Sequence, residues 1–337
     1  IIEKIPAPPG SVNDPLQMLV SSLDYSPYLG RISIGKITGG ELNVNQDIAV
    51  SMRDGSIKAA RITKLYRFES NQKIAAKNAF CGDIVAVAGM DEVTVGCTYV
   101  DPENPRPLPA MEIDPPTISM SFVCNDSPFA GREGQFVTAR HLADRLFRET
   151  MADVALEVQA LSEGNGFRVS GRGDLHLSIL IEKMRREGYE FQVTRPEVIF
   201  KEDSEGQRLE PFEELSIDVD EDFVGVVMEK LGQRKGQVLE MDSTEGMTRL
   251  RYLIPTRGLL GYRSEFMTDT KGLGVMNYVF SGYKAYTGEI KHRTKGTLVA
   301  MLNCQTVAYA LFNLQERGRL FIGPAIDVYR GQIIGEH

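Results

Sequence analysis

Asp174 and His176 are the two side chains that most readily suggest chemistry. They stand two residues apart in the stretch SGRGDLHLSILIEKMRREG, residues 170–188. A carboxylate and an imidazole can bind one metal ion or share a proton during catalysis. On an α-helix, however, residues i and i+2 point about 200° apart, so these two side chains do not converge on one ion. The spacing therefore favours a structural role for His176 over a catalytic one.

The tripeptide Arg172-Gly173-Asp174 in the same stretch resembles a motif that cell-adhesion receptors bind. That motif requires an exposed loop in a secreted protein, whereas here a helical apolar stripe follows it, at Leu177, Leu180, Ile181 and Met184. Asp174 stands where a carboxylate accepts unpaired N–H groups at a helix start, and Gly188 is placed for the cap at the helix end. We therefore expect the first turn of a packed helix, not an adhesion site.

Motifs for nucleotide, metal or nucleophilic chemistry are absent from the sequence. A P-loop requires G-x-x-x-x-G-K-[ST], and the nearest run, GKIT from Gly35, lacks the hydroxyl residue directly after Lys36. The four cysteines form no C-x-x-C pair of the kind that zinc sites use. We predict no catalytic residue, no nucleotide-binding residue, no metal ligand and no cofactor within these 337 residues.

Charge is unevenly distributed along the chain, whose net charge of −8 argues against a general nucleic-acid-binding protein. Residues 201–222 hold 2 basic and 10 acidic side chains. Residues 223–337 hold 15 basic and 10 acidic side chains, a net charge of +5. Charge alone favours solvated surfaces, and the sharper interpretation is a basic last third that faces phosphate groups.

The elements that position these residues begin with a β-rich segment. Residues 13–110 consist of short β-rich runs separated by glycine-containing turns, a pattern typical of a β-barrel. Six prolines lie between residues 101 and 116, and proline removes a backbone donor and restrains the residue before it. We therefore place a linker and a domain boundary near residue 110, and we interpret the proline-rich residues 1–12 as another linker.

Two later segments share one order of strand and helix patterns. Residues 111–203 follow the β-α-β-β-α-β order of a ferredoxin-like domain. Residues 204–281 repeat this order without repeating the sequence, and residues 282–337 are β-rich with one helix. The predicted fold is a mixed multidomain chain with a β-barrel, two ferredoxin-like α+β domains and part of a β-rich C-terminal domain.

Several stretches resemble the translational GTPases of the elongation factor G class. GKITGGELNVNQDIAV and CGDIVAVAG are similar to the second-domain barrel of that class. SGRGDLHLSILIEKMRREG is similar to its S-G-x-G-E-L-H-L helix, with Asp174 in place of glutamate. Within the class, GYRSEFMTDTKGLG and LFNLQERGRLFIG are similar to the BipA (TypA) family of ribosome-associated GTPases, and the resemblance extends from about Asn13 to His337.

This resemblance assigns residues 13–110, 111–203 and 204–281 to the second, third and fifth domains of the class, and residues 282–337 to a family-specific C-terminal domain. It implies a G domain before residues 1–12 that binds GTP with Mg²⁺ and hydrolyses GTP, so the present chain has no GTPase activity of its own. It implies docking on the ribosome in ribosome assembly or in translation under stress. The implied partners are rRNA, ribosomal proteins and, through a basic loop beyond residue 337, A-site tRNA. A cytoplasmic monomer without membrane contact is also implied.

Basic side chains of the last third are the expected ribosome contacts, because arginine and lysine make most contacts with phosphate. Lys291, Arg293 and Lys295 alternate in the run KHRTKG and would share one face of a strand. A solvated edge guarded by lysine explains this run equally well. The candidate rRNA contacts are Arg234, Lys235, Arg257, Arg263, Lys271, Lys291, Arg293 and Lys295.

Two other functions stay open at this point. The first is a stand-alone RNA-binding or scaffold module with no GTPase parent, which predicts that the chain binds free rRNA as tightly as ribosomes. The second is an enzyme whose site the motifs do not reveal, which predicts a concave pocket lined by carboxylates or histidines with perturbed pKa values.

Overall fold

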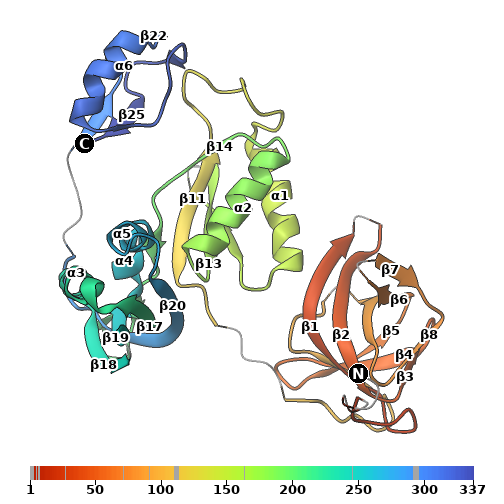
Figure 1. Ribbon diagram of the computed structural model, residues 1–337. Helices are drawn as coiled ribbons and strands as arrows, with labels where there is room; N and C mark the ends of the chain where they lie inside the picture. Colours follow the sequence, from red (N-terminus) through yellow and green to blue (C-terminus); the bar gives the residue numbers. More distant parts are fainter. Residues whose placement is uncertain are drawn as a thin grey trace. The chain divides into compact units, whose positions relative to one another are not determined.

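The computed structural model describes residues 4, 6 and 8–337, except residues 27, 71, 91, 110–113, 163, 245 and 291–295. The chain divides into two compact units. Figure 1 shows the helices and strands of both. One unit contains Ile1–Asn125 with Glu133–Ile199, and the other contains Asp126–Arg132 with Phe200–His337. No helix among the described residues is long and apolar enough to cross a membrane.

The first unit opens with an eight-stranded antiparallel sheet, in the order β5-β4-β10-β1-β2-β9-β6-β7, and a separate pair of strands, β3 and β8. Its core is filled by apolar side chains that alternate along the strands, such as Met18 and Val20 on β1 and Val85 and Val87 on β9. These strands fall where the sequence predicts short β-rich runs. They are β1 (Gln17–Ser26), β2 (Gly30–Gly39), β3 (Glu41–Asn43), β4 (Asp47–Ser51), β5 (Ile57–Arg61), β6 (Lys64–Glu69), β7 (Gln72–Ala75), β8 (Asn78–Phe80), β9 (Ile84–Ala88) and β10 (Thr98–Val100).

An α+β domain follows in the same unit, with the sheet order β12-β13-β11-β14 and a short strand, β15, beside β11. Apolar residues of β11 and β13, among them Phe122 and Val169, are buried. The helices bury Leu142 and Leu146 on α1 and Leu177, Leu180 and Met184 on α2. The element order is the β-α-β-β-α-β pattern that the sequence predicts. The elements are β11 (Ile118–Cys124), α1 (Ala139–Ala152), β12 (Glu157–Ala160), β13 (Gly166–Gly171), α2 (Asp174–Arg186), β14 (Phe191–Val193) and β15 (Glu197–Val198).

The second unit contains an α+β domain with the sheet order β16-β17-β19-β18, and β20 also pairs with β17. Alternate residues of β17 and β19 join residues of α3 and α5 in one core, which includes Leu215, Tyr252, Leu231 and Phe266. The elements are β16 (Lys201–Glu202), β17 (Arg208–Asp220), α3 (Glu221–Gln233), β18 (Gln237–Thr244), β19 (Met247–Pro255), α4 (Thr256–Leu259), α5 (Tyr262–Asp269) and β20 (Val275–Ala285). The last strand therefore extends four residues beyond the predicted boundary at residue 281.

The C-terminal segment, residues 296–337, forms two small sheets around a core of Ala300, Val328 and Ile334. β25 lies between β21 and β23 in one sheet, and β22 pairs with β24 in the other. The elements are β21 (Thr297–Val299), β22 (Cys304–Gln305), α6 (Ala308–Leu314), a 3₁₀ turn (Gln315–Arg317), β23 (Arg319–Leu320), β24 (Asp327–Val328) and β25 (Ile333–Glu336).

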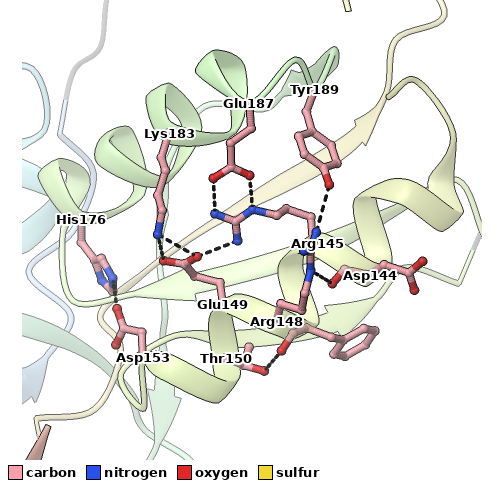
Figure 2. Close-up of polar contacts among 11 residues, drawn as sticks. Asp144, Arg145, Arg148, Glu149, Thr150, Asp153, His176, Lys183, Glu187 and Tyr189 are labelled. Atoms are coloured by element: carbon pink, nitrogen blue, oxygen red, sulfur yellow. Dashed lines mark hydrogen bonds and ion pairs between the residues drawn. The ribbon is translucent and has the colours of Figure 1, made fainter. Parts of the chain in front are cut away.

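A buried arginine joins the two helices of the first α+β domain (Figure 2). Arg145 on α1 donates from Nε and Nη2 to the Glu187 carboxylate, at 2.5 and 2.9 Å, and from Nη1 to Glu149, at 2.6 Å. Lys183 on α2 donates to Glu149 at 3.0 Å and closes the network. The Arg145 side chain is only 6% exposed, so water cannot replace these partners. The network therefore fixes how α1 and α2 pack on the sheet.

Arg145→Met should lower the free energy of unfolding by about 2 kcal/mol, because it removes three charge-assisted hydrogen bonds made by a buried side chain to the partly exposed carboxylates of Glu149 and Glu187. Arg185→Met is the matched control, since the Arg185 side chain is 69% exposed and pairs with Glu182 at the surface. We expect the control to leave the free energy of unfolding nearly unchanged, because a solvent-exposed ion pair contributes little. Urea unfolding followed by circular dichroism measures both variants, and equal losses would contradict the assignment.

Candidate nucleic-acid interface

Asp174 and His176 face different partners, as their spacing indicates. Asp174 is the first residue of α2, and its carboxylate accepts the N–H of Leu175 at 2.8 Å. Nε2 of His176 lies 2.6 Å from Oδ2 of Asp153, and its Nδ1 accepts the N–H of Arg172 at 3.4 Å (Figure 2). Both nitrogens of the imidazole ring are thus occupied within the protein, and the ring ties the start of α2 to the end of α1. In the described part of the chain, no three His, Cys, Asp or Glu side chains are close enough to hold a metal ion.

Arg234 lies at the end of α3 and directs its guanidinium group into the protein. Nη1 donates to the carbonyl oxygens of Gly258 and Leu260 at 2.8 and 3.3 Å. Nη2 donates to Glu265 at 2.9 Å, and the Arg234 side chain is 17% exposed. Arg234 therefore joins α3 to the chain around α4 and α5, which leaves little of its charge for an external phosphate.

Arg257, on α4, is buried to a greater degree than Arg234. It is 8% exposed, and its guanidinium group bonds to the carboxylate of Glu210, which is fully buried. The same group donates to Thr287 and to the carbonyl oxygen of Gly288. The geometry gives Arg257 an internal role, and the sequence offered no direct sign of it, because Glu210 lies 47 residues away in the chain.

Lys235 and Lys271 share an uncommon backbone conformation at the ends of two helices. Their φ angles are +67° and +52°, in the left-handed region that favours glycine. Each lysine directly follows the residue that caps the C-terminus of its helix, α3 or α5. The glycine after each lysine donates its backbone N–H to a carbonyl oxygen of the last helical turn, at 2.8 Å in both cases. The end of α2 has the same bonding with Gly188, at φ +90°, in the lysine's place. Lysine at this position stores strain that Gly188 avoids.

Lys235, Arg263 and Lys271 are the exposed members of the candidate set that the structure describes. Among the described residues, none forms an ion pair or a side-chain hydrogen bond with Lys235 or Arg263. Nζ of Lys271 lies 5.7 Å from the centre of the Phe223 ring, an arrangement that leaves its hydrogen-bond donors open to solvent. We refer to these three residues as the exposed cations.

The exposed cations divide between the two ends of a helix pair. Arg234, at the end of α3, binds Glu265 near the start of α5, whereas Lys271, after α5, lies over Phe223 near the start of α3. The two helices therefore run antiparallel, with Lys235 and Arg263 at one end and Lys271 at the other. Lys291, Arg293 and Lys295 lie outside the described residues, so the strand predicted there stays a prediction.

Two other arginines of the last third, Arg249 and Arg251, are neutralised by ion pairs on the protein. Arg249 donates to Asp218 at 2.7 and 3.1 Å, and Arg251 donates to Glu240 at 2.7 Å and also pairs with Glu214. These arginines face away from the helices, on the open side of the sheet. Charged residues alternate with apolar residues along both β17 and β19, and this pattern is the sequence signal from which such cross-strand pairing could be predicted.

Family models match most of the chain after its first 29 residues. The model described as elongation factor Tu domain 2 matches residues 30–100. The elongation factor G C-terminus model matches residues 207–294, and the TypA/BipA C-terminal domain model matches residues 295–337.

Curated relatives match this chain along its whole length. The large ribosomal subunit assembly factor BipA of Bacillus subtilis is 44% identical over 339 residues, and its counterpart in Synechocystis is 47% identical over 338 residues. The matches cover 100% of this chain and 55% and 56% of those proteins. This chain belongs to the BipA family. The similarity along the whole chain confirms the BipA-family resemblance inferred from its motifs. The chain spans about half the length of the curated relatives it matches.

A solved structure agrees with this assignment at the level of fold. A crystal structure of a Thermus thermophilus protein has a TM-score of 0.52 and 15% identity, and it covers 82% of the BipA-family chain and 56% of the Thermus chain. At this identity the likeness concerns the fold alone.

Lys235→Gly and Lys271→Gly should each raise the free energy of unfolding by about 0.5–1 kcal/mol, because glycine relieves the left-handed strain at a moderate entropic cost. The reverse change, Gly188→Lys, should lower it by about 1 kcal/mol, and an added Cβ there meets no atom within 4 Å. Guanidinium unfolding curves measure all three variants. A loss of stability in both lysine variants would show that the lysines do not strain the fold.

Acid should destabilise this BipA-family chain. The pKa of Glu210 is lowered from 4.5 although burial raises it, because bonds from Arg257 and Thr287 outweigh burial, and Arg145 likewise lowers the pKa of Glu187. A depressed folded pKa contributes stability above the unfolded value of 4.5, and that stability is lost as the pH falls through the folded pKa. The urea midpoint should therefore decrease steadily from about pH 5 to about pH 2. A constant midpoint across this range would refute the linkage.

Proposed function

We propose that this chain is the ribosome-docking part of a BipA-family translational GTPase whose whole protein acts in assembly of the large ribosomal subunit. The names of the curated relatives support this role. GTP hydrolysis would belong to a G domain outside these 337 residues, with GTP and Mg²⁺ bound there, because the sequence holds no P-loop. The stand-alone RNA-binding or scaffold module is not favoured, because the similarity to BipA proteins covers the chain from end to end.

We also propose the domain organisation that the resemblance implies, with one adjustment. The segments 13–110, 111–203 and 204–281 would be the second, third and fifth domains of the elongation factor G class. The end of β20 at Ala285 favours moving the last of these boundaries a few residues later. Residues 295–337 would be part of the family-specific C-terminal domain, where the TypA/BipA model matches.

The exposed cations are the single observation that supports rRNA docking by this chain. Arg234 and Arg257 are engaged inside the protein, so Lys235, Arg263 and Lys271 are the described members of the candidate set whose charge is available to a phosphate. Lysine and arginine with open donors bind phosphate oxygens, and they do so without reading base sequence. Their placement at both ends of a helix pair would suit two separate points on an RNA backbone rather than one phosphate group.

The strained lysines add support to this interpretation. A left-handed non-glycine residue is costly, and such residues concentrate at functional sites. Glycine would close the ends of α3 and α5 with less strain, as Gly188 does for α2. A requirement for the two ammonium groups at these ends would explain the choice of lysine. The same proposal includes the other features that the family resemblance implies. These are contact with ribosomal proteins and A-site tRNA, a role under stress, a monomeric state and a cytoplasmic location.

The charge-neutral triple variant Lys235→Gln, Arg263→Gln, Lys271→Gln should bind large ribosomal subunits at least about tenfold more weakly than the unchanged chain at moderate salt. The slope of log affinity against log salt should also become shallower, by about 0.7–0.9 for each phosphate that is no longer neutralised. Co-sedimentation across a salt series measures both quantities, with free 23S rRNA in a parallel series.

The matched control replaces three exposed arginines that are already paired, in the variant Arg185→Gln, Arg186→Gln, Arg249→Gln. It removes the same total charge and should retain most of the affinity. An equal loss in both variants would show that only net charge matters. Binding to free rRNA as tight as binding to subunits would favour the stand-alone module instead.

A further inference from the structure

The chain leaves the second α+β domain alongside a fully buried carboxylate. Strand β20 ends at Ala285, and residues 286–288 then pass Glu210, whose side chain is 0% exposed. Glu210 accepts the backbone N–H of Thr287 at 2.8 Å and the hydroxyl of the same residue at 2.9 Å. A strand residue thus holds the first part of the connection to residues 296–337.

Arg257 grips the same three residues from the other side. It is bound to Glu210 through two nitrogens, and Nη2 also donates to the Thr287 hydroxyl at 3.2 Å and to the carbonyl oxygen of Gly288. Its guanidinium carbon lies 4.7 Å from the centre of the Tyr286 ring. One side chain therefore contacts Tyr286, Thr287 and Gly288 in succession.

A second arginine joins the beginning and the end of the domain. The guanidinium group of Arg208 lies 3.5 Å from the centre of the Phe200 ring and 5.2 Å from that of the Tyr286 ring. The backbone N–H of Tyr286 donates to the carbonyl oxygen of Arg208 at 3.1 Å. Cation–π contacts of this kind add to backbone pairing. The exit of the chain is consequently held over three consecutive residues.

Stability alone does not require a buried ion pair at this place. Replacing a buried pair by apolar residues of similar volume often leaves stability unchanged or higher. Apolar side chains, however, cannot accept the N–H of Thr287 or donate to the oxygen of Gly288. The charged pair therefore attaches the connecting residues to the domain, which an apolar pair would not do.

We propose that Glu210 and Arg257 are positioning residues that form a buried clamp on residues 286–288, and that this clamp holds the chain in place where it leaves the second α+β domain toward the C-terminal segment. The proposal does not depend on ribosome docking, since it concerns a role inside the chain. It also gives Arg257 a different function from the phosphate contact that the sequence suggested.

Hydrogen–deuterium exchange with mass spectrometry on the full chain tests the clamp. In Arg257→Lys, the ion pair with Glu210 persists but the two-pronged grip is lost, because an ammonium group lacks the planar fork of arginine. Amides of the peptide that covers residues 286–290 should exchange about tenfold faster, whereas amides of α3 should keep their protection.

The double variant Glu210→Leu, Arg257→Met separates attachment from stability. It removes both charges, so the domain should keep its urea midpoint while the peptide at 286–290 exchanges faster. Arg249→Met, which breaks only an exposed pair on the same sheet, is the control and should leave that peptide unchanged. Unchanged exchange at 286–290 in both clamp variants would overturn the proposal. So would acceleration that is equal throughout the domain, since that would mean general unfolding.

Discussion

A buried arginine bound to a glutamate joins separate elements in each α+β domain of this chain. In the first domain Arg145 joins α1 to Glu187 beyond the end of α2, and in the second Arg257 joins α4 to Glu210 on β17. A charge out of water is tolerated only with a partner and satisfied donors, so each pair dictates the packing of the elements that carry it. The helices, the sheet register and the chain exit all have to accommodate these two pairs.

Local periodicity was enough to predict most of the fold from the sequence. The apolar spacing of Leu177, Leu180 and Met184 predicted α2 and its buried face, and Gly188 predicted its end. Both β-α-β-β-α-β orders were likewise visible, because strand and helix periods depend on neighbouring residues only. The end of the last strand was harder to predict, because β20 continues to Ala285 by pairing with β17, far away in the sequence.

The environment of individual charges could not be predicted in the same way. Arg257 and Arg263 looked equivalent as basic residues near a helix, yet one is buried against Glu210 and the other is exposed. The acidic run 201–222 suggested a solvated surface, whereas Glu210 within it is fully buried. Burial of a charge depends on contacts between residues that are dozens of positions apart in the sequence. Local spacing does not reveal such contacts.

Pairing within the protein reconciles a net charge of −8 with the phosphate contacts that we propose for its surface. Arg249 and Arg251 are matched by carboxylates across the sheet, and Arg234 is matched by Glu265, so these cations add little to the field outside. Counterion release depends on cations that meet phosphate, not on the sum over the chain. An acidic chain can therefore dock on RNA through a few unpaired cations, provided that its acidic excess lies elsewhere. Such docking is local, and rigid helix ends such as those that carry Lys235 and Lys271 are well suited to it.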